Sequence, residues 1–307
     1  MYYFIVNPNS RSGKGALIWK GLEGILNERN IEYKTFFTEY RGHAVLLSES
    51  ITSDAAPENP LTLIAVGGDG TIQEVLSGVR DLSYITFGYI PTGSGNDFCR
   101  GMKLPTEPGE ALDLILSSCR PHPMDVPVLT CGTGSSHFAI SCGIGFDAGV
   151  CHEVSVTPMK KILNRIGLGK LVYLFVALKQ LLFLKPSPMT LVMDDDNVQQ
   201  FSKVYFTAVM NQKYEGGGFK FCPHASPSDG YLDVIVVDGL SKPKVLCCLP
   251  TAFFGKHTIF HGIHIFRCKK IDIHSDLALP VHKDGESAGI LKDFSVSIGA
   301  SQVRMIS

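Results

Sequence analysis

The stretch Leu61-Thr62-Leu63-Ile64-Ala65-Val66-Gly67-Gly68-Asp69-Gly70-Thr71 decides the fold of this chain. Its first six residues are mostly apolar and predict a buried strand, and Ile72-Gln73-Glu74-Val75-Leu76 predicts a helix directly after the glycines. Glycines let the backbone take positive φ and let a ligand come close to its N–H groups. Because the N-terminus of a helix attracts anions, the stretch predicts a phosphate-binding turn.

Asp69 is the acidic member of this turn. A carboxylate beside a phosphate is repelled unless a cation lies between them, and Mg²⁺ would supply that cation. The alternative interpretation is structural, with Asp69 or Thr71 acting only as a helix cap.

A second turn follows the next predicted strand, residues 85–90. It reads Pro91-Thr92-Gly93-Ser94-Gly95-Asn96-Asp97-Phe98-Cys99-Arg100. Ligands of open parallel α/β sheets bind at the carboxyl ends of the strands. We therefore expect Asp69 and Asp97 to face one nucleotide and its metal from neighbouring loops.

The amino terminus supplies a third loop. A short apolar strand at 2–6 is followed by Asn7-Pro8-Asn9-Ser10-Arg11-Ser12-Gly13-Lys14-Gly15. This is not a Walker A loop, because glycine follows Gly13-Lys14 where Ser or Thr is required, and no GxGxxG fingerprint is present. Asn7-Pro8 is also an ordinary turn opener and Lys14 an ordinary solvated cation. Three glycine-bearing loops at three strand ends favour one shared binding site.

Together these motifs resemble the bacterial diacylglycerol kinase family of soluble lipid kinases, whose superfamily includes sphingosine and ceramide kinases. The resemblance continues through Gly216-Gly217-Gly218, Ser228-Asp229-Gly230-Tyr231-Leu232-Asp233-Val234 and Asp284-Gly285-Glu286, so it covers nearly the whole chain. NAD kinases and phosphofructokinases carry similar glycine turns. The segment 91–100 and the late Asp-Gly-Glu separate this chain from them.

The resemblance implies ATP and Mg²⁺ as cofactors, with Asp69 and Asp97 positioning the metal directly or through water. Thr38 matches a threonine that contacts ATP in the family, although it is equally interpreted as a helix cap. The nucleotide-binding residues predicted in this way are Asn7, Pro8, Lys14, Thr38, Gly67, Gly68, Asp69, Gly70, Thr71, Ser94 and Asn96.

The pair Asp284-Gly285 is first of all a hairpin signal, since Asp-Gly favours a type I′ turn. The resemblance places Asp284 and Glu286 at a cleft between two domains. A carboxylate there can orient a lipid hydroxyl and take its proton. Glu286 is the predicted general base and Asp284 its partner, although the choice between them stays open. If the segment is extended, both side chains share one face.

A second, structural magnesium, held partly by backbone carbonyl oxygens, is also implied by the resemblance, at Ser226, Asp229 and Tyr231. With one carboxylate among these ligands we expect weak binding. A turn without metal is the alternative.

Two domains are predicted, since 307 residues exceed the usual size of one core. Alternating strands and helices over 1–124 predict an α/β nucleotide-binding domain with a parallel sheet. Short strands over 125–293, for example 138–142 and 204–209, predict a β-sandwich that binds the lipid acceptor. The resemblance implies a fold like that of NAD kinase and phosphofructokinase, with the active site in the cleft and residues 294–307 returning to the first domain.

The net charge of −1 and a pI near 6.8 give no case for nucleic-acid binding. Nine cysteines without CxxC pairs indicate a reducing compartment. No basic leader and no run of about 20 apolar residues is present, so we expect a cytoplasmic protein without a transmembrane anchor. Exposed strands are compatible with a homodimer.

The segment between Val154 and Met193 has no acidic residue and six lysines and arginines. Its apolar residues recur at helical spacing, which predicts peripheral contact of residues 158–186 with the inner face of the membrane. The alternative is a helix that covers the β domain.

The favoured function is an ATP-dependent lipid kinase that transfers the γ-phosphate to a hydroxyl of diacylglycerol or a related lipid. The alternatives are an NAD kinase-like enzyme and a catalytically idle, nucleotide-binding membrane regulator. The presence of Asp69, Asp97, Asp284 and Glu286 argues against the idle regulator.

Overall fold

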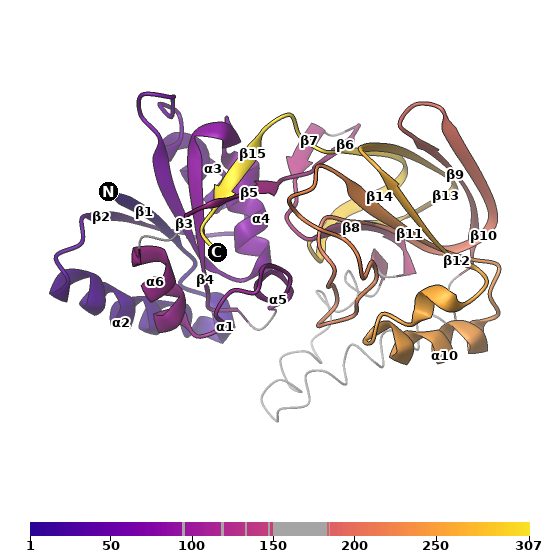
Figure 1. The fold of residues 1–307 in the computed structure, drawn as a ribbon, viewed down its shortest axis with the longest axis horizontal. Helices are drawn as coiled ribbons and strands as arrows, with labels where there is room; N and C mark the ends of the chain where they lie inside the picture. The colour runs from indigo at the N-terminus through magenta and orange to yellow at the C-terminus, as the bar shows by residue number, and fades with distance from the viewer. Residues whose placement is uncertain (94–95, 118–119, 133, 147, 150–182, 184) are drawn as a thin grey trace.

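The computed structural model shows two domains side by side (Figure 1). It describes residues 1–93, 96–117, 120–132, 134–146, 148–149, 183 and 185–307. The first domain is built on a six-stranded sheet and the second on a nine-stranded sheet. Among the described residues, no helix has the length and apolar content that a membrane span requires.

The first sheet has the order β2-β1-β3-β4-β15-β5. All neighbours are parallel except β15 and β5, which confirms the predicted parallel sheet. The strands are β1 (Tyr2–Val6), β2 (Tyr33–Phe37), β3 (Leu61–Gly67), β4 (Ile85–Pro91), β5 (His122–Asp125) and β15 (Gln302–Met305).

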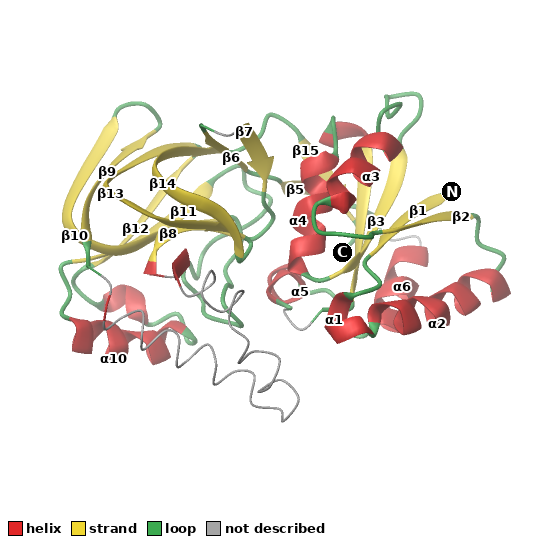
Figure 2. Ribbon diagram, turned by 180° about the vertical axis from the view of Figure 1, so that it is seen from behind, coloured by secondary structure: helices red, strands yellow, loops and turns green. Residues whose placement is uncertain are grey.

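Helices cover both faces of this sheet, as both ribbon views show (Figures 1 and 2). Side chains of a strand alternate between faces. Phe4 and Val6 therefore pack with the helices α2 and α6, while Ile5 packs with α3 and α4. The helices are α1 (Ser10–Gly13), α2 (Gly15–Glu28), α3 (His43–Ile51), α4 (Asp69–Gly78), η1 (Leu82–Tyr84), α5 (Asp97–Met102) and α6 (Pro108–Leu116).

The second domain is an antiparallel sheet in the order β12-β11-β10-β8-β13-β14-β6-β7, with β9 paired to both β10 and β13. Its strands are β6 (Val128–Cys131), β7 (Gly134–His137), β8 (Ser141–Gly145), β9 (Ser187–Met193), β10 (Asn197–Met210), β11 (Leu232–Asp238), β12 (Ile263–Cys268), β13 (Lys270–Lys283) and β14 (Glu286–Ser297). The helices α10 (Lys242–Ala252) and η2 (His257–Ile259) lie between β11 and β12.

The two layers of the predicted sandwich belong to one continuous sheet. Both β8 and β9 bridge β10 and β13, so the sheet curls and its apolar faces meet. The enclosed core includes Ile144, Leu191, Val209, Val234 and Val281.

The strand predicted at 138–142 begins later than expected, at Ser141. The backbone N–H groups of Ala139 and Ile140 donate to the Asp284 carboxylate instead of a neighbouring strand, at 2.7 Å each. A contact across 145 positions therefore replaces part of the ladder, and no local pattern reveals it.

Two connections join the domains. β5 of the first sheet runs into β6 of the second, and β14 leads back to β15. Within the predicted return segment 294–307, residues 294–297 still belong to β14. The first sheet is re-entered at Gln302, where β15 inserts between β4 and β5.

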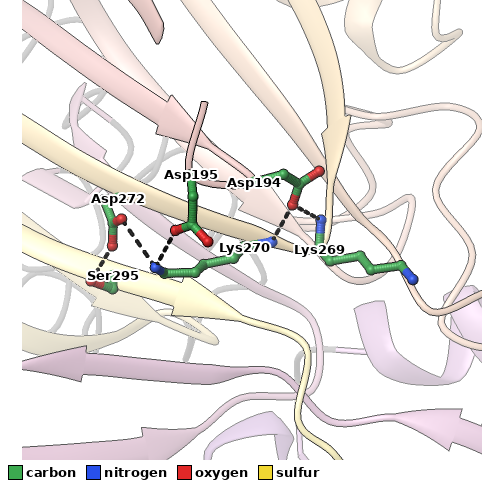
Figure 3. A network of polar contacts seen from close by, with 6 residues as sticks. All are labelled: Asp194, Asp195, Lys269, Lys270, Asp272 and Ser295. Atoms are coloured by element: carbon green, nitrogen blue, oxygen red, sulfur yellow. Dashed lines mark hydrogen bonds and ion pairs between the residues drawn. The ribbon is translucent and has the colours of Figure 1, made fainter. Parts of the chain in front are cut away.

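A polar network closes one corner of the second sheet (Figure 3). Asp194, in the turn between β9 and β10, accepts hydrogen bonds from the backbone N–H groups of Lys269 and Lys270 at 2.8 and 3.0 Å. The Lys270 ammonium contacts Asp195 at 2.6 Å and Asp272 at 3.5 Å. These contacts join the β9–β10 turn to the start of β13, so the network holds the corner of the sheet together.

Candidate active site

The two predicted glycine turns touch each other at the carboxyl edge of the first sheet. The backbone N–H groups of Thr92 and Gly93 donate to the carbonyl oxygen of Gly67 at 2.7 and 3.0 Å. A Cβ atom at Gly93 would lie 2.7 Å from the Gly68 Cα atom. Glycine is needed at this crossing because no side chain fits between the two backbones.

The first loop joins them. The Asn7 amide donates to the Thr71 hydroxyl at 3.3 Å, and the Ser10 and Thr92 hydroxyls are 2.7 Å apart. The Pro8 carbonyl accepts from the backbone N–H of Ala16. The three loops expected to share one site therefore form one connected surface.

The other predicted nucleotide-binding residues lie around this surface. Thr38 is buried at the end of β2, where its backbone N–H donates to the Val6 carbonyl. Lys14 is exposed between α1 and α2. The amide oxygen of Asn96 is buried and has no hydrogen-bond partner. Ser94 lies outside the described residues.

Asp69 begins α4 with one carboxylate oxygen, Oδ1, buried and without a partner. The backbone N–H of Phe98 bonds to the carboxylate. Burial, followed by the charges of Asp97 and Asp284, raises the pKa of Asp69 to about 7. Burial and the two neighbouring carboxylates thus outweigh the opposing effects of the Phe98 N–H group and the Arg100 guanidinium. This fits a cation: Mg²⁺ is commonly held by one carboxylate together with substrate phosphates and water.

Asp97 has both carboxylate oxygens occupied. One accepts from the Arg100 guanidinium at 2.6 Å, and the other from the backbone N–H of Gly217 at 2.7 Å. Burial still raises the pKa of Asp97. Because Gly217 belongs to the second domain, Asp97 links the two domains beside Asp69, and direct metal binding would cost it one of these bonds.

The segment at Asp284-Gly285 is the two-residue hairpin that the sequence indicates. Both residues have positive φ, 47° and 79°, as a type I′ turn requires, and Lys283 pairs with Glu286. Asp284 therefore points inward, where its carboxylate accepts three backbone N–H groups, from Ala139, Ile140 and Ser141. Its burial raises its pKa to about 6.

Asp284 and Glu286 do not share a face, contrary to the expectation for an extended segment. The turn separates them: Asp284 is buried against residues 139–141 of the second domain, and Glu286 lies beside Gly70 of the first. A Cβ atom at Gly70 would lie only 3.2 Å from the Glu286 Oε1 atom. Glu286 thus stands directly over the glycine turn of the first domain.

Arg41 is a site residue that the sequence analysis did not single out. Its guanidinium contacts the Glu286 carboxylate at 2.6 Å, from the segment that follows β2. Both side chains are exposed to solvent, so the ion pair is easily exchanged. The only local signal was its position three residues after Thr38.

A second missed pair lies behind the acidic hairpin. His282 accepts at Nδ1 from the backbone N–H of Gly285 at 3.2 Å, so its Nε2–H donates to the Glu215 carboxylate at 2.9 Å. Both side chains are buried. The pair ties the hairpin to the loop 215–219, which also carries Gly217.

The predicted structural metal site has a different partner. The Asp229 carboxylate contacts the Arg267 guanidinium at 2.6 Å and accepts from the backbone N–H of Tyr231 at 3.1 Å. Arg267 also lies over the Tyr231 ring, 4.2 Å from its centroid, and the Ser226 hydroxyl is 3.4 Å from that of Ser228. The Arg267 guanidinium therefore competes with a cation for the Asp229 carboxylate. These contacts do not test the backbone carbonyl oxygens expected among the ligands, so the structural metal site stays a prediction. Across the described part of the chain, no group of three His, Cys, Asp or Glu residues has the geometry of a metal site.

An α/β domain with glycine loops at its strand ends, covered by a β domain that presents an acidic hairpin, defines a class of two-domain kinases that includes diacylglycerol kinases and NAD kinases. Residues 1–131 match the family model of the diacylglycerol kinase catalytic domain. Residues 141–304 match that of the YegS C-terminal NAD kinase beta sandwich-like domain. The chain belongs to the diacylglycerol kinase family of lipid kinases.

Curated relatives agree with this assignment. The chain is 32% identical over 300 residues to "Putative lipid kinase YtlR" of Bacillus subtilis, covering 94% of each chain. It is 28% identical over 270 residues to a diacylglycerol kinase of Staphylococcus saprophyticus, covering 87% of this chain and 82% of that one.

Two solved structures share the fold. A crystal structure described as a putative diacylglycerol kinase from Bacillus anthracis superposes with a TM-score of 0.75 at 24% identity, covering 99% of this chain and 94% of that one. An NAD kinase from Archaeoglobus fulgidus in complex with ATP superposes with a TM-score of 0.54 at 12% identity, covering 100% and 94%. These likenesses confirm the predicted fold class.

Proposed function

We propose that this lipid kinase transfers the γ-phosphate of ATP to a hydroxyl of diacylglycerol or a closely related lipid. The observation that carries the proposal is the position of Glu286, whose carboxylate lies over Gly70 at the start of α4. A phosphate held at this helix N-terminus would lie beside a carboxylate from the other domain.

Each side of the cleft has its own role in this proposal. The backbone of residues 67–71, with Asn7 and Thr71, holds the phosphates of the nucleotide. Asp69 and the phosphates would hold Mg²⁺, which neutralises phosphate charge when it is bound. Glu286 orients the lipid hydroxyl and accepts its proton. Asp284 acts through the hairpin: its three N–H contacts fix the turn from which Glu286 projects.

Arg41 can bind either the Glu286 carboxylate or a phosphate of the nucleotide. Its guanidinium reaches Glu286 at 2.6 Å across the cleft and is itself exposed. An arriving phosphate would compete for the same cation, because arginine binds carboxylates and phosphates alike. We infer that ATP draws Arg41 away from Glu286 and leaves that carboxylate available to the hydroxyl.

Membrane contact through residues 158–186 is also part of the proposal. Except for Phe183, Lys185 and Pro186, that segment lies outside the described residues. A cytoplasmic protein that meets its substrate at the inner face of the membrane is consistent with the basic, acid-free composition of this stretch.

The decisive experiment measures transfer of labelled γ-phosphate from ATP to a panel of lipids in mixed micelles, with NAD as a further acceptor. We expect labelled diacylglycerol or a related lipid, and transfer by the Glu286→Gln variant that is slower by about 10²-fold or more. Labelled NAD alone would favour the NAD kinase-like function, which the fold shared with an ATP-bound NAD kinase makes the second candidate. Tight ATP binding with no labelled acceptor would favour the idle regulator.

A further inference from the structure

Helix α10 has apolar side chains on its inner and on its outer face. Val245, Cys248 and Ala252 are buried, while Leu246 and Phe253, the residue directly after the helix, are exposed. A helix at the surface of a soluble domain normally turns polar residues toward water. The outer face of α10 departs from that rule.

The chain beyond α10 extends the apolar area. Phe254 is 74% exposed and Ile259 is 78% exposed, and Phe260 is exposed as well. We call Lys244, Leu246, Phe253, Phe254, Lys256, Ile259 and Phe260 the α10 surface. Exposed apolar side chains that gather in one short segment mark an interaction site more often than single scattered ones.

The charged residues in and next to this surface are positive. Residues 239–262 carry three lysines, Lys242, Lys244 and Lys256, and no acidic residue. Lys244 and Lys256 are exposed, and within the described part of the chain neither has a carboxylate partner. Aromatic and aliphatic side chains flanked by lysines are complementary to an anionic bilayer surface, where the rings enter the acyl boundary and the cations meet headgroups.

The α10 surface is connected to the active site by packing. The Phe253 ring stacks on the Phe219 ring with centroids 4.0 Å apart, and the backbone N–H of Lys220 donates to the Ala252 carbonyl at 2.9 Å. The same loop carries Gly217, which bonds to Asp97. In both ribbon views α10 and α5 lie in the lower half of the molecule (Figures 1 and 2).

We propose that the α10 surface docks the protein on anionic lipid bilayers, with Phe254 and Ile259 inserted and Lys244 and Lys256 on the headgroups. The proposal rests on the proposed lipid kinase function only in that a lipid acceptor resides in a bilayer. The α10 surface is a second basic, apolar segment of the chain, separate from residues 158–186.

The test is co-sedimentation with phosphatidylcholine vesicles, with and without phosphatidylglycerol, in the absence of nucleotide. We expect binding to anionic vesicles that weakens with salt. The double variant Phe254→Ser/Ile259→Ser should lose at least about tenfold in vesicle affinity. The double variant Lys244→Gln/Lys256→Gln should lose roughly fivefold for each lysine on anionic vesicles only.

Matched controls are Val198→Ser and Lys34→Gln, which remove an exposed apolar side chain and an exposed lysine elsewhere. Val198 lies next to the β9–β10 turn, at the end of the second domain opposite α10 (Figures 1 and 2). Both controls should bind vesicles like the wild type.

Wild-type affinity of the Phe254→Ser/Ile259→Ser variant would overturn the proposal. So would a lower molecular mass of this variant in solution with unchanged vesicle binding, since the surface would then join two copies of the chain. Transfer to a water-soluble, short-chain diacylglycerol separates the two ideas. Phosphate transfer to this soluble lipid should be the same in the Phe254→Ser/Ile259→Ser variant as in the wild type. If the proposed kinase function is wrong, no protein will transfer phosphate to it, and vesicle binding will still be seen.

Discussion

Asp69 carries the clearest conflict between burial and charge. Its pKa is raised to about 7, above its ordinary value of 3.8, so the folded protein holds the proton more tightly than the unfolded chain. The neutral Asp69 carboxyl group contributes fully to the free energy of unfolding at pH values below the pKa of Asp69 in the unfolded chain. This contribution is lost as the pH rises through 7. At the pH where a kinase works with nucleotide, the free protein is destabilised by this side chain.

The variant Asp69→Asn tests that statement. Between pH 5.5 and pH 8 the free energy of unfolding of the wild type should fall relative to that of the variant by about 2 kcal/mol. Denaturant unfolding at the two pH values measures this difference, and phosphate transfer should be lost at both. Parallel pH dependence of the two proteins would contradict the assigned environment of Asp69.

Glu286 lies over Gly70 of the first domain and forms an exposed ion pair with Arg41. The variant Glu286→Gln keeps the shape of the side chain and removes its capacity to take a proton, so kcat should fall by about 10²- to 10⁴-fold. The melting temperature and the affinity for ATP should change little, because an exposed ion pair contributes about 0–1 kcal/mol. The transfer assay measures kcat, and calorimetric titration measures the affinity for ATP. A kcat within a few-fold of wild type would show that Glu286 is not the general base.

At the scale of elements, the crossing of the two glycine turns leaves no room for a side chain at Gly93. In Gly93→Ala the new Cβ would lie 2.7 Å from the Gly68 Cα atom, and the strain should lower the free energy of unfolding by about 1–3 kcal/mol. The matched control is Gly68→Ala, whose Cβ would meet its nearest neighbour at an ordinary 3.6 Å. Thermal unfolding of both variants should separate them, and equal stability would show that the loops can move apart.

Local patterns were sufficient for most elements of the first domain. Apolar strands ending in glycine turns are short-range features, so β1, β3, β4 and the helices after them were predictable from residue order alone. The start of β8 was wrong because the contact of Ala139 with Asp284 spans 145 positions. Arg41 was missed for the same reason, since its partner Glu286 lies 245 positions away. The inward direction of Asp284 required the positive φ of a turn, which an extended pattern does not contain.

At the scale of the whole molecule, the six residues after Ser301 hold the first domain closed. β15 lies between β4 and β5, and Val303, Met305 and Ile306 are buried. A chain truncated after Ser301 should lose more than about 4 kcal/mol in the free energy of unfolding, from buried apolar area alone. Circular dichroism during heating, together with ATP binding, measures the loss. The control Arg304→Ala, which removes an exposed side chain of the same strand, should stay within about 0.5 kcal/mol of wild type.

The late position of β15 also has a consequence for biosynthesis. The strand emerges from the ribosome only after the 176 residues between Asp125 and Gln302 have been made. At ordinary translation rates that interval lasts roughly 10–35 s, and throughout it β4 and β5 lack the strand that joins them. The first domain, although most of it is encoded first, is completed last. A chain interrupted before β15 therefore cannot yield a closed first domain detached from the second.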